Sequence, residues 1–393
     1  MAKLDAVSVK NLKLLKDVTL NLTNLNLLTG VNSSGKSTFI QAILLLMQNK
    51  EALRTIEMFK IIESEIANNL DEEQIEEALA QFTKRKITFN GILMKLGNAS
   101  EVLNQDAYGE QIKIAINSGK IKGSISVDPA TLNVQMELES IEKKYIGIVS
   151  SFDDAQYLHT DRIQPQNIYD ISTTRVSDGL LGVHGEYTAH YLDENRRENL
   201  TIPELKHPNA KTSQLLENVS YWMSEISQGV AVNVKKYDEI QKVSLSYQYT
   251  YGDTTSNEYA PMNVGFGLTY VLPIIVALLK AKSDEIIIIE NPESHLHPKG
   301  QVKIAHLCAL AAQHGVQLII ESHSDHFLNG LRVATKQKQI APENLKFFYF
   351  TKNTTELSAQ VTELFIDENG RINDEWPEGF FDEYGKQMDE LLW

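Results

Sequence analysis

Cysteine is almost absent from this sequence, since Cys308 is the only one among 393 residues. A single thiol cannot form an intrachain disulfide or build a cysteine-based zinc site, so both are excluded within the chain. The alanines around Cys308 recur at helical spacing, which favours a core position on a helix over a reactive thiol. Stability is therefore expected to come from ordinary apolar packing.

Long uncharged apolar runs are also lacking. The longest candidate, Val271 to Leu279, is far shorter than the ~20 residues that cross a bilayer. The first residues show no basic stretch followed by an apolar one, as a secretion signal would. We expect a soluble, cytoplasmic protein with no membrane partner.

Positive charge is scarce relative to negative charge. There are 37 Lys and Arg against 52 Asp and Glu, which gives a net charge of −15. Such a chain is not a general binder of polyanions, so contact with nucleic acid would need a local basic patch or a separate partner. With 42% hydrophobic and 23% charged residues, a fully disordered chain is excluded.

The periodicity of apolar residues predicts α/β structure at both ends of the chain. Strands are predicted at 18–22, 25–29, 285–290, 316–321 and 345–350, and helices at 37–47, 298–313 and 325–336.

The middle of the chain divides into three stretches. Residues 50–85 have apolar positions at helical spacing and predict a helical hairpin, either packed on the core or protruding as an acidic arm that docks a partner. Residues 86–160 are mostly β-like, with turn signals near 117–119 and 128–129. Residues 165–255 predict a mixed helical and β insertion, because their apolar content argues against a linker.

The segment from Gly30 to Ser37 fits the pattern G-x-x-x-x-G-K-[ST] between a predicted strand and a predicted helix. Glycines allow the tight loop whose backbone N–H groups surround phosphate oxygens, and the helix N-terminus adds partial positive charge. Lys36 would reach the β- and γ-phosphates and the Ser37 hydroxyl would ligate Mg²⁺. The predicted residues for binding ATP are Gly30, Asn32, Ser33, Ser34, Gly35, Lys36, Ser37 and Thr38.

A nucleotide site of this kind also needs a carboxylate at the end of an apolar strand. Four consecutive isoleucines lead to Glu290, as expected for a strand covered on both faces, and the chain continues as Asn291-Pro292-Glu293-Ser294-His295-Leu296-His297-Pro298. A second apolar strand ends at Glu321 and is followed by Ser322-His323-Ser324-Asp325-His326.

These two segments resemble the ABC-type ATPase head of the SMC, RecF and OLD group, and especially its stand-alone bacterial members. The resemblance extends to the segment from Arg371 to Asp382 and, less specifically, to Tyr157–Arg162. It implies a P-loop NTPase of ABC/SMC-head type, with an antiparallel β subdomain and helical insertions. It also implies a single head built from both ends of the chain, 1–48 and 260–366, followed by a C-terminal tail over 367–393. Such proteins often accompany nuclease or other effector genes in anti-phage defence operons.

The resemblance also implies roles for individual residues. Glu290 takes the metal-side carboxylate position, and His323 takes the place of the switch histidine that contacts the γ-phosphate. The turn with Asn263, Gly265 and Gly267 resembles the ABC signature, which binds ATP held by the opposite subunit; a plain helix-start turn is the alternative.

One departure from the family pattern concerns hydrolysis. Asn291 stands where most ABC heads have a glutamate that activates water, and an asparagine amide cannot accept a proton. Either Glu293 supplies the carboxylate or hydrolysis is slow and the ATP-bound state is long-lived. We favour a slow ATPase switch.

Other readings of the same residues are less favoured. The histidines near the strand ends lack the spacing of a zinc-binding helix, and Ser322, His323 and Asp325 are neighbours in sequence that rarely form a catalytic triad. A structural salt bridge is the default role for Arg162, with nucleotide or interface contact as the alternative.

The leading hypothesis is an ATP-dependent homodimer, or higher oligomer, that gates an effector such as a nuclease or toxin encoded by an adjacent gene. The main alternative is a DNA-binding repair or maintenance ATPase of the RecF or SMC kind, against which stand the negative charge and the absence of a long coiled coil. A transporter ATPase subunit is a third, weaker possibility.

Overall fold

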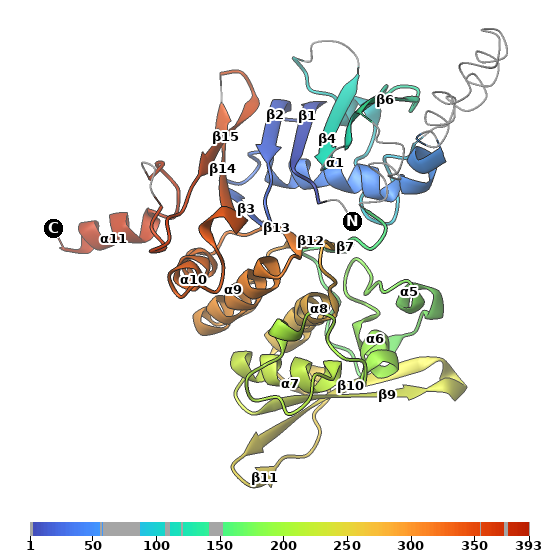
Figure 1. Cartoon of the computed structure of the whole chain (residues 1–393), viewed down its shortest axis with the longest axis vertical. Coiled ribbons are helices and arrows are strands. Elements are labelled where there is room, and N and C mark those ends of the chain that lie inside the picture. The colour runs from blue at the N-terminus through green and yellow to red at the C-terminus, as the bar shows by residue number, and fades with distance from the viewer. Residues whose placement is uncertain are drawn as a thin grey trace. The chain divides into compact units, whose positions relative to one another are not determined.

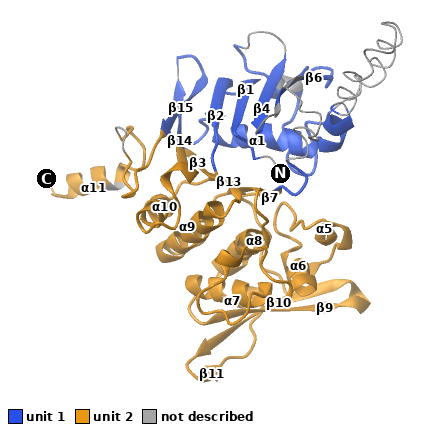
Figure 2. Ribbon diagram, in the orientation of Figure 1, with its two compact units in different colours: residues 1–23, 30–155, 348–363 blue, residues 24–29, 156–347, 364–393 orange. Residues whose placement is uncertain are grey.

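The computed structural model describes residues 3–55, 57, 87–106, 111–118, 121–140, 152–353, 355–372 and 376–392. The chain forms two compact units (Figure 2), each assembled from several segments. The first contains 1–23, 30–155 and 348–363, and the second contains 24–29, 156–347 and 364–393. The helical hairpin predicted over 50–85 lies outside the described residues, apart from 50–55 and 57, which are helical.

The first unit is organised around an antiparallel sheet with the order β2-β1-β4-β5-β6. Strand β4 alternates buried and half-buried side chains, as expected when one face of a sheet covers a core. Within the described residues of 86–160, this agrees with the predicted β pattern. The strands are β1 (Ala6–Leu12), β2 (Leu15–Asn21), β4 (Ile112–Ser118), β5 (Ile121–Val127) and β6 (Val134–Ser140).

Helix α1 (Lys36–Gln48) packs on β1 within the same unit. Nine of its side chains are buried, on most of its faces, in accord with its apolar sequence. The first unit also holds the short helix α4 (Ala99–Val102), most of β14 (Leu345–Asn353) and most of β15 (Ser358–Leu364).

The second unit contains a parallel sheet in which β3 (Leu25–Gly30), β13 (Gln317–Glu321), β12 (Ile286–Glu290) and β7 (Gln156–Leu158) are successive neighbours (Figure 1). Every residue of β12 and β13 is buried, which explains why both strands are continuous apolar runs. The pairing register sets Glu290 opposite Glu321. Both carboxylates therefore lie at the carboxyl edge of the sheet, where ligands bind in folds of this class.

Helices α8 (Phe266–Lys280), α9 (Pro298–Gln313) and α10 (Asp325–Lys336) belong to the same unit, and α9 packs between the other two. The bounds of α9 and α10 coincide with the sequence prediction. Cys308 is fully buried on α9, as predicted, and burial raises the pKa of its thiol.

Residues 165–255 fold into helices packed on a small antiparallel sheet. In that sheet β10 pairs with β8, β9 and β11, and α7 packs on β9 and α8. The elements are β8 (Ile168–Asp170), α5 (Thr173–Ser177), α6 (Thr188–Asn195), α7 (Leu215–Ile226), β9 (Val230–Tyr237), β10 (Lys242–Tyr251) and β11 (Thr254–Thr255). The C-terminal tail ends in a helix, α11 (Glu383–Leu392), which the sequence pattern did not predict.

Candidate functional site

The loop from Gly30 to Ser37 joins the end of β3 to the start of α1, so the predicted strand–loop–helix setting is confirmed. Both glycines have positive φ, 136° at Gly30 and 107° at Gly35, and Ser33 is left-handed with φ 59°. A Cβ at Gly30 would lie 2.0 Å from the Phe350 carbonyl oxygen. Only glycine fits there, because the backbone conformation and the close approach both exclude a side chain.

Lys36 is the first residue of α1, and its side chain folds back over the loop. Its ammonium group donates hydrogen bonds to the carbonyl oxygens of Gly30 (3.1 Å) and Val31 (2.9 Å). The first turn of α1 holds no acidic residue, and Ser37 is exposed to solvent. The buried hydroxyl of Ser34 has no hydrogen-bond partner among the described residues. This combination of a lysine, hydroxyls and a helix N-terminus fits the phosphates and Mg²⁺ of a nucleotide.

Glu290 lies in a buried polar cluster at the edge of the parallel sheet in the second unit. The Tyr157 hydroxyl donates to its Oε1 (3.0 Å), and the His159 Nε2 lies 3.9 Å from its Oε2. Burial, followed by the charge of Glu321 on the next strand, raises the pKa of Glu290 to about 7. A carboxyl group held in this way is stabilised as a carboxylate when a cation is brought to it.

Asn291 leaves the strand in a left-handed conformation, with φ 46°. Its N–H donates to the Glu321 carbonyl oxygen (2.8 Å), and its side-chain amide donates to the Thr160 hydroxyl (2.7 Å). The Asn291 side chain is thus engaged with the segment that follows β7. Its Oδ1 is buried without a partner among the described residues.

Glu293 and His323 lie together, as the prediction of a shared site requires. The Glu293 Oε1 accepts a hydrogen bond from the His323 backbone N–H (2.8 Å). The other carboxylate oxygen of Glu293 is buried without a described partner. The His323 ring points back to the sheet, with its Nε2 3.7 Å from Glu321 Oε1.

The turn that resembles the ABC signature leads into α8. Asn263 ends a short 3₁₀ helix (Pro261–Asn263), and Gly265 is the N-cap of α8. A Cβ at Gly267 would lie 2.4 Å from the His295 carbonyl oxygen, whereas one at Gly265 would meet nothing within 4 Å. Gly267 therefore lets α8 pack directly on the segment that follows Glu290.

The predicted residues thus divide between the two units. Gly30 to Ser37 belong to the first unit, while Glu290, Asn291, Glu293 and His323 are brought together in the second. Four residues of the cluster in the second unit had no predicted role, namely Tyr157, His159, Thr160 and Glu321. The parallel arrangement of β7, β12 and β13 places at one edge Glu321, which ends β13, and His159 and Thr160, which follow β7. Tyr157 lies within β7 itself.

The prediction that Arg162 forms a structural salt bridge is wrong for the part of the chain that the structure describes. Its guanidinium group donates instead to backbone carbonyl oxygens, including those of Glu290 and Asn291. No group of three or more metal-ligating side chains occurs in the described part of the chain.

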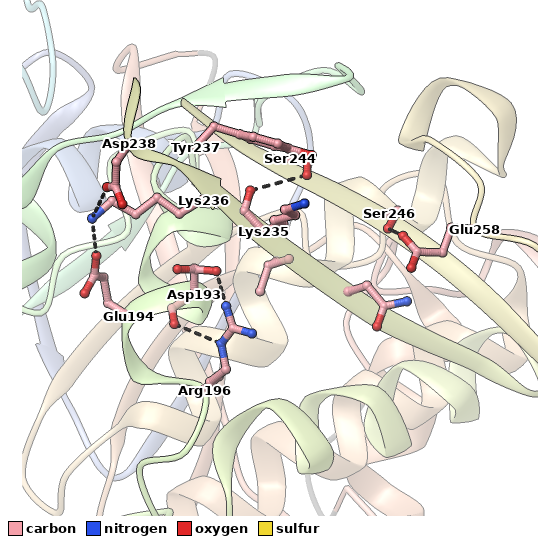
Figure 3. Close-up of a pocket in the computed structure, with 12 residues that line it drawn as sticks. Asp193, Glu194, Arg196, Lys235, Lys236, Tyr237, Asp238, Ser244, Ser246 and Glu258 are labelled. Carbon is pink, nitrogen blue, oxygen red and sulfur yellow. Dashed lines mark hydrogen bonds and ion pairs between the residues drawn. The ribbon is translucent and has the colours of Figure 1, made fainter. Parts of the chain in front are cut away.

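A groove of about 670 Å³ lies elsewhere in the second unit, between the C-terminal end of α6 and strands β9 and β10 (Figure 3). Two of its three basic side chains are paired with neighbouring acids: Lys236 contacts Glu194 (2.6 Å) and Asp238 (3.3 Å), and Arg196 contacts Asp193. The third, Lys235, lies over the Tyr237 ring. With most of its positive charge paired and none of the residues from Gly30 to Ser37 in its lining, this groove is a poor candidate for the nucleotide site.

No helix among the described residues has both the length and the apolar character that crossing a membrane requires. A comparison with curated proteins gives no match. Among protein-family models, "AAA ATPase domain" matches residues 2–117 and "Protein of unknown function (DUF3696)" matches 340–391. The model described as "AAA domain, putative AbiEii toxin, Type IV TA system" matches residues 126–329.

Two solved structures show where the fold belongs. An Smc head bound to the C-winged helix domain of ScpA is 11% identical, with a TM-score of 0.53 over 93% of this chain and 98% of that chain. The Smc head domain from Pyrococcus furiosus, with an extended coiled coil and the C-terminal domain of ScpA, is 12% identical, with a TM-score of 0.52 over the whole of both chains. This confirms the predicted P-loop ATPase fold of ABC/SMC-head type. Since the match to residues 126–329 spans more than half of the chain, the protein belongs to that AAA domain family.

Proposed function

We propose that the protein is an ATP-binding and slowly hydrolysing switch that dimerises through its nucleotide sites and gates an effector in bacterial anti-phage defence. The observation that carries this proposal is the loop from Gly30 to Ser37 at the N-terminus of α1, with its two left-handed glycines and buried lysine. The membership of an AAA domain family and the similarity of the fold to Smc heads support it.

Each residue in the proposed mechanism has a role that its chemistry allows. Lys36 would exchange its bonds to two loop carbonyls for bonds to phosphate oxygens, a change that keeps its charge compensated. Ser37 and Glu290 would hold Mg²⁺, which when bound neutralises charge on the β- and γ-phosphates. His323 would contact the γ-phosphate and sense whether it is present.

Slow hydrolysis follows from the residue beside Glu290. Asn291 cannot accept a proton, and its amide is engaged by Thr160. Positioning and charge stabilisation would still act without a base. The competing candidate is Glu293, which has one carboxylate oxygen on the His323 N–H and the other without a described partner.

A single-turnover assay that compares Asn291→Ala with Glu293→Gln separates these two mechanisms. If no carboxylate acts as a base, Glu293→Gln leaves the rate of the chemical step near that of the wild type. A fall of about a hundredfold in Glu293→Gln, with ATP binding intact, would instead identify Glu293 as the base. The Asn291→Ala variant shows how much the amide contributes to orienting water.

The proposed dimer would place the turn at 263–268 against ATP held by a second subunit. Met262 precedes this turn and Phe266 lies within it; the two side chains are exposed by 65% and 41%, and a Cβ at Gly265 would meet nothing within 4 Å. These are features that a subunit contact would cover. Light scattering with and without ATP tests this: dimers should form with ATP in the wild type and not in Lys36→Ala.

The proposed effector is the product of an adjacent gene. The family description names an AbiEii toxin and a type IV toxin–antitoxin system, which supports a role beside a second protein. Co-purification of that product with the wild type but not with Lys36→Ala would support nucleotide-gated binding. Strong stimulation of hydrolysis by bare duplex DNA, with steep salt dependence, would favour the repair alternative instead.

A further inference from the structure

Arg162 is a buried cation for which the proposed mechanism has no use. It follows β7 in the second unit and is 1% exposed. A guanidinium group keeps its charge in proteins, and burial of a charge is costly unless hydrogen bonds compensate it. The groups that contact the guanidinium group therefore indicate its role.

Three hydrogen bonds tie Arg162 to the end of the Glu290 strand and to the end of β7. Its Nη1 donates to the carbonyl oxygens of Glu290 (2.8 Å) and His159 (3.1 Å), and its Nη2 donates to that of Asn291 (2.6 Å). The two carbonyls that leave β12 are thereby satisfied where the sheet no longer pairs them. The planar fork of arginine binds both at once, which the ammonium group of lysine cannot reproduce.

These bonds hold the chain where it departs from regular geometry. Asn291 has a φ of 46°, and its own N–H is bound to the carbonyl oxygen of Glu321. Arg162 binds the carbonyl oxygens of Glu290 and Asn291, and Glu321 binds the N–H of Asn291. The backbone at these two residues is therefore held by hydrogen bonds to two other parts of the chain. The Glu290 side chain is attached to the backbone that Arg162 holds, so the direction of its carboxylate depends on these hydrogen bonds.

The other face of Arg162 contacts α8. Its guanidinium carbon lies 5.8 Å from the centre of the Tyr270 ring, within the range of a cation–π interaction. Tyr270 in turn packs edge-on against His295, with ring centres 4.6 Å apart. One side chain thus joins the strand end that carries Glu290 to the helix that begins at the signature-like turn.

We propose that Arg162 is a positioning residue for ATP hydrolysis, which fixes the backbone of Glu290 and Asn291 and couples it to α8. The inference rests on the proposed function, because it concerns the rate of the same reaction. Arg162 acts through the residues that it holds, so its loss should lower the rate of the chemical step more than the affinity for ATP.

The experiment compares Arg162→Lys with a matched control, Arg332→Lys. Arg332 lies in the same unit, donates to the Gly370 carbonyl oxygen (3.0 Å) and lies 5.7 Å from the centre of the Trp376 ring. It thus makes the same kinds of contact away from Glu290. ATP affinity, the single-turnover rate and the melting temperature are measured for both variants and for the wild type.

We expect Arg162→Lys to lower the single-turnover rate at least about tenfold, while the dissociation constant for ATP changes less than about threefold. Arg332→Lys should keep the wild-type rate. A variant Arg162→Lys with a lower melting temperature but the wild-type rate per bound ATP would overturn the proposal, because the arginine would then be structural only.

Tyr270 provides a second test if Arg162→Lys does not fold. Tyr270→Phe keeps an aromatic ring beside the guanidinium group and should keep the rate, whereas Tyr270→Leu removes it and should lower the rate. Equal rates in the two variants would remove the coupling to α8. Absence of ATP binding in the wild type would instead overturn the proposed function, and this inference with it.

Discussion

The phosphate loop and the strand-end cluster differ in how they are specified. The loop from Gly30 to Ser37 is a continuous segment whose glycine conformations and helix start follow from its own eight residues. The cluster around Glu290 combines residues separated by more than a hundred positions, such as Tyr157 and Glu321, and depends on the register of three parallel strands. A local pattern identifies the first, whereas the second needs the tertiary structure.

The two regions also differ in their electrostatics. Lys36 has its charge compensated by carbonyls of its own loop. Glu290 lies against Glu321 in a buried site, where the ionised form is disfavoured. The loop presents a cation that can bind an anion, whereas a bound cation would stabilise the ionised form of Glu290 in the cluster.

The largest expected effect separates binding from hydrolysis. Lys36→Ala should weaken ATP binding about a hundredfold or more, because it removes the ammonium group that reaches the phosphates. Glu290→Gln should leave ATP bound and slow hydrolysis by about a hundredfold, because it removes the metal-side charge. Equilibrium binding of a fluorescent ATP analogue and single-turnover rates measure the two quantities.

A control for that comparison lies in the same unit as Lys36. Lys10 is exposed and forms an ion pair with Asp17 (2.8 Å), so Lys10→Ala should change neither binding nor rate. Equal loss of ATP binding in Lys36→Ala and Glu290→Gln would contradict the division of roles between the two regions.

The next effect concerns pH and should be confined to the cluster. The pKa of Glu290 rises from 4.5 to about 7 on folding, so the folded protein binds the proton more tightly. The stability that the protonated Glu290 carboxyl group contributes is present below pH 4.5 and is lost as the pH rises to about 7. The free energy of unfolding of the wild type should fall over that range by about 1–3 kcal/mol relative to Glu290→Gln. Denaturant titrations without Mg²⁺ measure it, and parallel curves would show that the carboxyl group is not perturbed.

The smallest effect tests the packing behind the cluster. Gly267→Ala should destabilise the protein by about 1 kcal/mol or more, because its Cβ would meet the His295 carbonyl oxygen. Gly265→Ala, where the space is open, should stay within about 0.5 kcal/mol of the wild type. Thermal unfolding of the pair checks this, and identical melting temperatures would mean that α8 can shift away from the segment after Glu290.

Much of the fold was predictable because its strongest signals are local. The starts of α9 and α10 follow from Pro298 in the first turn of a helix and Ser324 as an N-cap, and the isoleucine run is typical of a buried strand. The contacts of Arg162 with Glu290 and Asn291 were not predictable, since these partners are backbone carbonyls more than a hundred residues away and leave no pattern in the sequence. The pairing of Glu290 with Glu321 likewise depends on strand register, which spacing alone does not define.

The sole cysteine has a practical consequence. Cys308 lies on the buried face of α9, so a maleimide dye should not label the native protein but should label the unfolded chain. The natural chain is thus a ready background for spectroscopy: a cysteine introduced on the exposed surface would carry a dye or spin label alone. Distances between such labels in mixed samples could report subunit association as nucleotide is added and removed.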